Sequence, residues 1–167
     1  MVLKSFAKIN LSLLINKKLD NGLHDIQSLF CLISLFDTIS IKKNSEKKRE
    51  DKIIFKGPFS KFVKNSDNSI KKTLILMRKL KIISSYYTVQ VNKRIPVFAG
   101  LGGGSSNAAT VFNFLSKKNI DEETYNYIVR KIGSDLRLFS NEIGFLRNLN
   151  KIQKITKNYR LFFLLVY

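Results

Sequence analysis

Apolar and polar residues alternate over much of the N-terminal third of the chain, which is the period of an extended strand with one buried face. The alternation is clearest at Ile9, Leu11, Leu13 and Ile15, so this segment predicts a half-buried strand. The dipeptide Asn21-Gly22 that follows is typical of a two-residue hairpin turn. Further extended segments are predicted at 24–34, 38–42, 53–55, 86–92, 143–146 and 161–167.

Apolar residues spaced by three or four positions predict helices at 68–81, 105–116 and 122–132. Asp67 or Asn68 is the expected N-cap of the first helix, and Asp121 that of the third. Gly133 is expected to end the third helix in the left-handed conformation. Strands outnumber helices and do not alternate strictly with them, which favours an α+β fold over a doubly wound sheet.

The chain has 167 residues, enough for one domain, and a formal net charge of +18. Such a charge favours nucleic-acid binding, but the basic residues are spread along the sequence and are not interleaved with aromatic ones. The densest run, 41–52, also carries acidic residues and predicts a solvated hairpin loop. We therefore expect a compositional origin for the charge and no nucleic-acid site. A basic nucleic-acid-binding domain is the alternative.

Several classes of protein are disfavoured by what the sequence lacks. No apolar run reaches the roughly 18 residues that a membrane span needs, and the N-terminus does not have the pattern of a signal peptide. Cys31 is the single cysteine, which excludes an internal disulfide and a cysteine-based metal cluster. We expect a cytoplasmic protein that binds no membrane and has no metal centre of its own.

The segment Pro96-Val-Phe-Ala-Gly-Leu-Gly-Gly-Gly-Ser-Ser-Asn107 contains four glycines directly before a predicted helix. Glycines let backbone N–H groups approach a bound anion closely, and the helix N-terminus adds partial positive charge. We expect Ser105, Ser106 and Asn107 to add side-chain donors. The segment predicts a polyphosphate cradle. It is not a P-loop, because Ser105 stands where a lysine is required, and the glycine spacing does not fit a dinucleotide fingerprint.

This segment resembles the ATP loop of the GHMP kinases, a family of ATP-dependent small-molecule kinases. Four other motifs occur in the family's order, namely Ala7-Lys-Ile-Asn-Leu11, Asn21-Gly-Leu-His-Asp-Ile-Gln-Ser-Leu-Phe30, Asp37-Thr-Ile39 and Gly133-Ser-Asp135. They are similar to the branch that phosphorylates the 2-hydroxyl of 4-diphosphocytidyl-2-C-methyl-D-erythritol in non-mevalonate isoprenoid biosynthesis. The resemblance implies ATP with Mg²⁺, and a cytidine diphosphate-linked small molecule as the acceptor. It leaves the oligomeric state open.

The resemblance also implies an architecture. Residues 1–158 would form an N-terminal ATP-binding domain like ribosomal protein S5 domain 2, and residues 159–167 a strand leading towards a second domain. The family's ferredoxin-like C-terminal domain, roughly another hundred residues, is absent from this sequence. The chain is therefore expected to be a fragment, a truncated product or a decayed kinase. A truncated pseudokinase that binds nucleotide without turnover is a second alternative.

Site residues follow from the resemblance position by position. Lys8 and Asp135 match the catalytic pair: a carboxylate can take the proton of the attacking alcohol, and an ammonium stabilises the forming alkoxide. The substrate would contact Asn10, His24 and Asp25. No residue is assigned to a metal. The nucleotide would contact Asn68 and the loop residues Pro96, Val97, Phe98, Ala99, Gly100, Leu101, Gly102, Gly103, Gly104, Ser105 and Ser106.

Three positions depart from the family's pattern. Phe98-Ala99 replaces a run of glycines at the start of the loop, and Leu23 replaces an aromatic residue before the histidine. Leu136-Arg137 replaces the usual Val-Pro, and Arg137 is either a phosphate ligand or a mark of relaxed selection.

Overall fold

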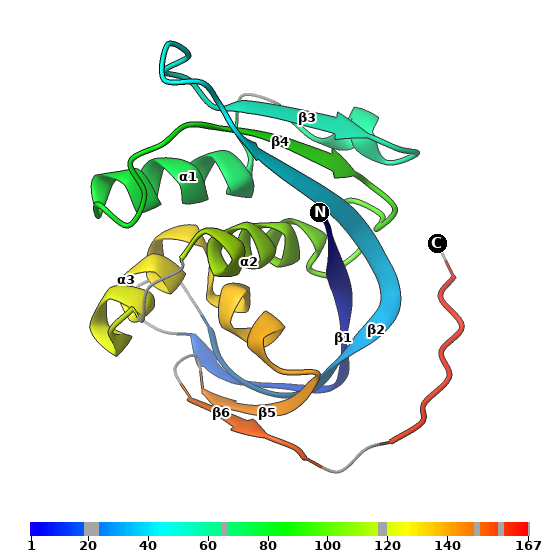
Figure 1. Cartoon of the computed structure of the whole chain (residues 1–167). Helices are drawn as coiled ribbons and strands as arrows, with labels where there is room; N and C mark the ends of the chain where they lie inside the picture. Colours follow the sequence, from blue (N-terminus) through cyan, green and yellow to red (C-terminus); the bar gives the residue numbers. More distant parts are fainter. Residues whose placement is uncertain (19–23, 65–66, 117–119, 149–150, 157–158, 167) are drawn as a thin grey trace.

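The chain folds into a strongly curved β-sheet with its helices gathered on the concave side (Figure 1). The computed structural model describes residues 1–18, 24–64, 67–116, 120–148, 151–156 and 159–166. The predicted α+β class is confirmed. In chain order the elements are β1 (Val2–Lys18), β2 (His24–Lys43), β3 (Lys52–Lys56), the 3₁₀ turn η1 (Ser60–Phe62), α1 (Ser69–Lys79), β4 (Tyr87–Asn92), α2 (Gly103–Leu115), α3 (Glu122–Ile132), the 3₁₀ segment η2 (Ser134–Ser140), β5 (Ile143–Asn148) and β6 (Lys151–Lys154).

The long strand β2 organises the sheet. One of its edges pairs with antiparallel β1 along most of its length. The other edge pairs with β4 through residues 38–43 and with β5 through residues 28–31, both antiparallel. Parallel β3 lies beyond β4, and antiparallel β6 lies beyond β5. The central position of β2 lets it pair with strands of both halves of the sheet and carry side chains to the site described below.

The core lies between the helices and the concave face of the sheet. The predicted apolar stripe of the first helix, Ile70, Leu74 and Met77, is fully buried. Ala108 and Ala109 let α2 approach the sheet closely because their side chains are small. The other principal members of this cluster are Ile39, Val89, Val91, Val111, Phe112, Ile128, Val129 and Leu136. No helix in the described ranges is long and apolar enough to cross a membrane.

Two of the predicted helices have the expected starts. Asn68 caps α1, because its side-chain oxygen accepts a hydrogen bond from the N–H of Lys71. Asp121 caps α3 in the same way through the N–H of Thr124. At the end of α3, Gly133 has φ +152° and ψ 140°. This positive φ favours glycine, but it is not the left-handed helical conformation that was predicted; it turns the chain directly into η2.

The strand predictions need two corrections around β2. Segments 24–34 and 38–42 are one continuous strand, interrupted only by a register shift that leaves Ser34 and Leu35 without partners on β1. A bulge of this kind bends a strand without ending it. The basic run 41–52 is exposed as expected, but it is not a hairpin loop, because β4 lies between β2 and β3 in the sheet.

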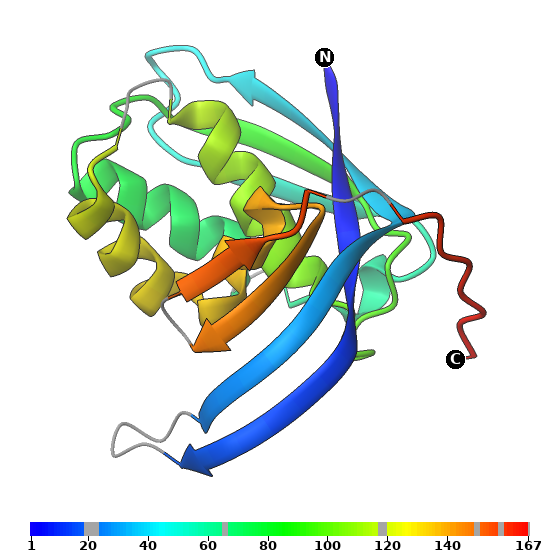
Figure 2. The same cartoon turned by 90° about the horizontal axis from the view of Figure 1, so that it is seen from below.

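The first half of β1 is packed against the core and the second half is not. The predicted hairpin between β1 and β2 exists, whereas the turn at Asn21-Gly22 lies outside the described residues. The far end of the hairpin projects from the body of the molecule (Figure 2), and β1 is exposed from Asn10 onward. Leu13, Leu14 and Ile15 are each more than half exposed, so the prediction of a half-buried strand is wrong there. The alternation of apolar and polar residues could not show that the layer packed against β1 covers only its first half.

The structure confirms one of the two strands predicted near the C-terminus and adds one that was not predicted. Ile143–Asn148 forms β5, which contains the predicted strand at 143–146. It is followed by β6, a strand that the sequence pattern missed because Lys-Ile-Gln-Lys has little apolar character. Residues 161–166 form no strand, although their composition favours one, because no other strand in the described ranges pairs with them. They run along the outside of the molecule (Figure 1).

Candidate active site

A cavity of about 490 Å³ lies where the glycine-rich loop meets the N-termini of α1 and α2. Every predicted nucleotide residue of the loop from Pro96 to Ser105 lines it, and so does Asn68. The remaining lining residues include Phe55, Phe62, Val63, Ser69 and Lys93. The loop and both helix starts therefore surround one hollow, and two helix N-termini bring their partial positive charge to it.

The backbone of the loop explains two of its glycines. Gly100 and Gly102 have φ values of +73° and +68°, which favour glycine. A Cβ at Gly102 would also lie 2.9 Å from the ring of Phe139 and 3.1 Å from Cγ of Lys8. At Gly103 a Cβ would lie 3.0 Å from the side chain of Ile95. Glycine at these positions thus lets the loop pack tightly onto the protein beneath it.

A side-chain hydrogen bond joins the two helix starts. The hydroxyl of Ser69, the first residue of α1, donates to the carbonyl of Gly104 at 2.7 Å. Gly104 belongs to the first turn of α2, because this helix begins at Gly103, two residues earlier than predicted. The last glycines of the motif are thus helical, and the N–H groups of the first helical turn are part of the cradle.

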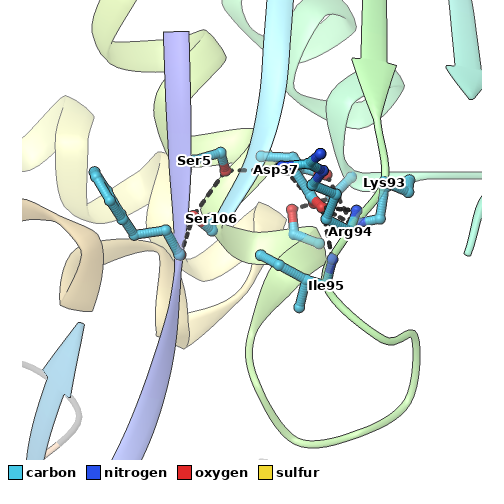
Figure 3. Close-up of polar contacts among 10 residues, drawn as sticks. Ser5, Asp37, Lys93, Arg94, Ile95 and Ser106 are labelled. Carbon is cyan, nitrogen blue, oxygen red and sulfur yellow. Dashed lines mark hydrogen bonds and ion pairs between the residues drawn. The ribbon is translucent and has the colours of Figure 1, made fainter. Parts of the chain in front are cut away.

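A buried polar network holds both ends of the loop in place (Figure 3). At its centre is Asp37 of β2, which is completely buried. One carboxylate oxygen accepts hydrogen bonds from the backbone N–H groups of Arg94 and Ile95, at 2.7 and 2.9 Å. The other accepts from the ammonium of Lys93 and from the amide of Asn107, the latter at 3.0 Å. Asp37 thereby joins the entry of the loop to the first turns of α2.

The side chains of Ser106 and Asn107, which were expected to act as donors to a ligand, are bonded to the protein itself. The hydroxyl of Ser106 donates to the carbonyl of Phe6 at 2.6 Å and lies 2.8 Å from the hydroxyl of Ser5. The amide of Asn107 donates to Ser5 at 2.9 Å as well as to Asp37. Both side chains are buried and fasten α2 to the strands. They therefore support the loop from below, and Asn107 also lines the cavity.

Lys8 and Asp135 lie together beside the loop, as the sequence predicted. The ammonium of Lys8 is 3.8 Å from a carboxylate oxygen of Asp135. The backbone N–H of Lys8 donates to the carbonyl of Leu101 at 3.0 Å. Lys8 is 10% exposed at its side chain and Asp135 39%, so the pair is open to solvent on the carboxylate side. Neither residue lines the cavity, and Leu101-Gly102 lies between the cavity and the pair.

Of the three predicted substrate residues, only Asn10 lies beside this pair. Its side-chain oxygen accepts a hydrogen bond from the ammonium of Lys8, and its amide donates to the hydroxyl of Ser28 at 2.8 Å. Asp25 faces Lys17 on the projecting hairpin. Nine residues of strand separate Lys17 from Lys8, a length of roughly 30 Å. His24 begins β2, and its side chain lies outside the described part of the structure.

Sequence reasoning did not assign the roles of four residues of the site. Asp37 was noted only as part of a family motif and Lys93 was not singled out, although an aspartate within an apolar strand indicates a buried partner. Ser69 was given no role of its own. Arg137, a possible phosphate ligand, is buried and donates to the side chain of Asn126 on α3. The described residues contain no group of three or more His, Cys, Asp or Glu side chains that could hold a metal ion.

Comparison with known proteins agrees with this geometry. Residues 68–139 match the profile of the GHMP kinases N terminal domain. The chain is 37% identical, over 83% of its length, to 4-diphosphocytidyl-2-C-methyl-D-erythritol kinase of Ureaplasma parvum and covers 52% of that protein. It is 38% identical to the enzyme of the same name from Pelagibacter ubique, over 85% of this chain and 47% of the relative. The chain thus spans about half the length of the curated relatives it matches.

Solved structures show the same likeness. A crystal structure of 4-(cytidine 5'-diphospho)-2C-methyl-D-erythritol kinase superposes with a TM-score of 0.69 at 25% identity, over 93% of this chain and 55% of that one. Mevalonate kinase of Methanococcus jannaschii superposes with a TM-score of 0.55 at 20% identity, over 94% and 56%. The second likeness is one of fold alone.

Proposed function

We propose that the chain, whose residues 68–139 match the GHMP kinases N terminal domain, forms the ATP-binding part of a kinase for the 2-hydroxyl of 4-diphosphocytidyl-2-C-methyl-D-erythritol. The observation that carries the proposal is the placement of Lys8 and Asp135, whose charged groups lie 3.8 Å apart beside the glycine-rich loop. The two residues are 127 positions apart in the sequence, so only the fold brings them together. The names of the relatives supply the choice of substrate.

The cradle would hold the triphosphate of ATP. Its glycines bring backbone N–H groups to the cavity, and α1 and α2 both begin there. A ligand with three linked phosphates can span the cavity and reach past Leu101-Gly102 to the Lys8–Asp135 pair. We propose that Mg²⁺ accompanies the triphosphate and offsets part of its charge. Water and phosphate oxygens would complete its coordination shell, as is usual for Mg²⁺ in such sites.

The transfer step assigns one role to each member of the pair. The oxygen of the substrate hydroxyl would attack the γ-phosphorus, and the bond from that phosphorus to the β–γ bridging oxygen would break, releasing ADP. Asp135 would accept the hydroxyl proton during the attack. The ammonium of Lys8 would stabilise the negative charge that develops on the attacking oxygen. Asn10 orients this ammonium through its side-chain oxygen.

The rest of the substrate would extend along the projecting hairpin. Asn10 lies at the base of this hairpin and Asp25 near its end, roughly 23 Å of strand away. An elongated acceptor could contact residues along it, and the chain's net positive charge favours a diphosphate-containing molecule. We propose that Asn10, His24 and Asp25 recognise different parts of that acceptor.

Phosphoryl transfer can be measured directly by ³¹P NMR. The chain would be incubated with ATP, Mg²⁺ and the proposed acceptor, alone and together with the C-terminal half of the Ureaplasma parvum relative. We expect ADP and a new phosphomonoester in at least the second reaction, and neither in a matched reaction with 2-C-methyl-D-erythritol alone. Binding of ATP without transfer in both reactions would contradict the proposed activity and favour the pseudokinase.

The two members of the pair can be tested for action on one proton transfer. In the active mixture, Lys8→Ala and Asp135→Asn should each lower turnover. The double variant should fall by less than the product of the two single effects, because both side chains serve the same step. Strictly multiplicative effects would show that the two residues act independently, against this mechanism.

A further inference from the structure

The residues that line the cavity are of two chemical kinds. One group consists of the glycines of the loop with the polar residues Ser69 and Lys93. The other group, called here the apolar wall, consists of Phe55, Phe62, Val63, Val97 and Phe98. The first group suits phosphates, whereas the apolar wall suits a flat ring. A nucleoside triphosphate carries phosphates and such a ring on one molecule.

Phe98, a residue of this apolar wall, has an unusual backbone conformation. It has φ +65°, the left-handed region, where a residue with a bulky side chain is a rare outlier. Such strain persists only where the surrounding structure enforces it, and it gathers at functional sites. The enforcement is visible here, because Asp37 fixes the loop three residues earlier, at Ile95. The loop therefore presents Phe98 in a costly conformation.

The side chain of Phe98 gains nothing from the free protein that would offset this cost. It is 94% exposed, and no aromatic or cationic group in the described residues contacts its ring. Phe62, the other exposed phenylalanine of the wall, already has the ammonium of Lys61 over its ring at 5.0 Å. Phe98 is thus the ring of this wall that is free to stack on a ligand.

We propose that Phe98 stacks on the base of the bound nucleoside triphosphate and contributes to the affinity for nucleotide over plain polyphosphate. This inference rests on the proposed function and adds to it a residue that recognises the base. Stacking of a base on an aromatic side chain is tolerant of base identity, because every base has a π-face. The contact would be absent for a ligand that has phosphates but no base.

The test compares ATP with tripolyphosphate by titration calorimetry on the full chain. Phe98→Ala should raise the dissociation constant of ATP about tenfold, the usual effect of losing one base-stacking ring, and leave that of tripolyphosphate within about twofold. Phe162→Ala is the matched control, because Phe162 is 83% exposed but does not line this cavity. This control should change neither constant.

A second variant reports the contact directly. The chain has no tryptophan, so Phe98→Trp introduces a single indole emitter. Its fluorescence should be quenched by ATP and not by tripolyphosphate. Unchanged ATP affinity in Phe98→Ala, or equal losses for both ligands, would overturn the stacking role while leaving the proposed function standing. Failure of the unaltered chain to bind either ligand would overturn the proposed function, and the stacking role with it.

Discussion

The two ends of the glycine-rich loop and its middle are built in opposite ways. The ends are tied down: Lys93 and Asn107 are buried, and both bond the fully buried Asp37. The middle is open: Phe98 is almost fully exposed, and a Cβ at Gly100 would meet nothing within 4 Å. The difference shows how a loop can be both preorganised and accessible, with its position set from below and its upper surface left for a ligand.

The largest effect on stability should come from removing the interactions of Asp37 that fix the two ends of the loop. Asp37→Asn removes the charge that pairs with the buried ammonium of Lys93, and breaking a buried pair in this way costs about 3–5 kcal/mol. Urea unfolding should show this loss. Asp67→Asn is the control, because the pair of Asp67 with Lys72 is mostly exposed and its loss should change the unfolding midpoint very little.

The double variant Asp37→Asn with Lys93→Met sharpens this result. It removes both charges, so no unpaired ammonium stays buried, and most of the lost stability should return. The entry of the loop would still lack its charged acceptor, so ATP binding should remain weak. Full recovery of ATP affinity along with stability would show that the network serves folding alone.

A pair of glycine substitutions compares the packed and the open part of the loop. Gly100→Ala and Gly102→Ala place the same side chain at similar positive φ, a strain of about 1–2 kcal/mol each. Gly102→Ala alone also meets Phe139 and Lys8. It should therefore unfold at lower urea than Gly100→Ala and should lose more turnover, since Lys8 must shift. Equal effects of the two substitutions would mean that the two parts of the loop do not differ in packing.

The smallest effect is expected outside the loop, at the start of α3, and concerns the pH dependence of the free energy of unfolding. Hydrogen bonds from Thr124 lower the pKa of Asp121, the N-cap of α3. A lowered pKa in the folded state means that this cap stabilises the protein above the carboxyl's ordinary pKa and is lost as the pH falls through the lower value. Asp121→Ala should therefore destabilise the chain at neutral pH and flatten the acid limb of its stability profile. An unaltered acid limb would count against the cap.

Local sequence patterns predicted much of the fold because local chemistry determines it. The N-caps Asn68 and Asp121 follow from side chains that satisfy free N–H groups at helix starts, and the stripe Ile70, Leu74 and Met77 follows from helical spacing. The exposure of the β1–β2 hairpin could not be predicted, because alternation does not reveal whether another layer covers the strand. The strand predicted at 161–167 is not formed by residues 161–166, because apolar composition does not reveal whether another strand is available to pair with them.

The candidate site was predictable to a different degree at each position. The glycine-rich loop can be recognised because the residues that define it are nearly consecutive in the sequence. The Lys8–Asp135 pair came from the family resemblance, since nothing local distinguishes either residue from an ordinary surface charge. The role of Asp37 depends on four partners that tertiary folding brings to it, three from the segment that follows β4 and one from α2. The same folding turned Ser106 away from the cradle to which its position in the motif had assigned it.

The most direct test of the account is the turnover of Asp135→Asn in the mixture that transfers phosphate, measured beside its affinity for ATP. Asparagine keeps the shape of the side chain and removes its basicity. We predict that turnover falls by roughly 10²–10⁴, the usual contribution of a general base, while the dissociation constant of ATP changes little. Normal turnover in this variant would contradict the assignment of Asp135 as the base and the account built on its contact with Lys8.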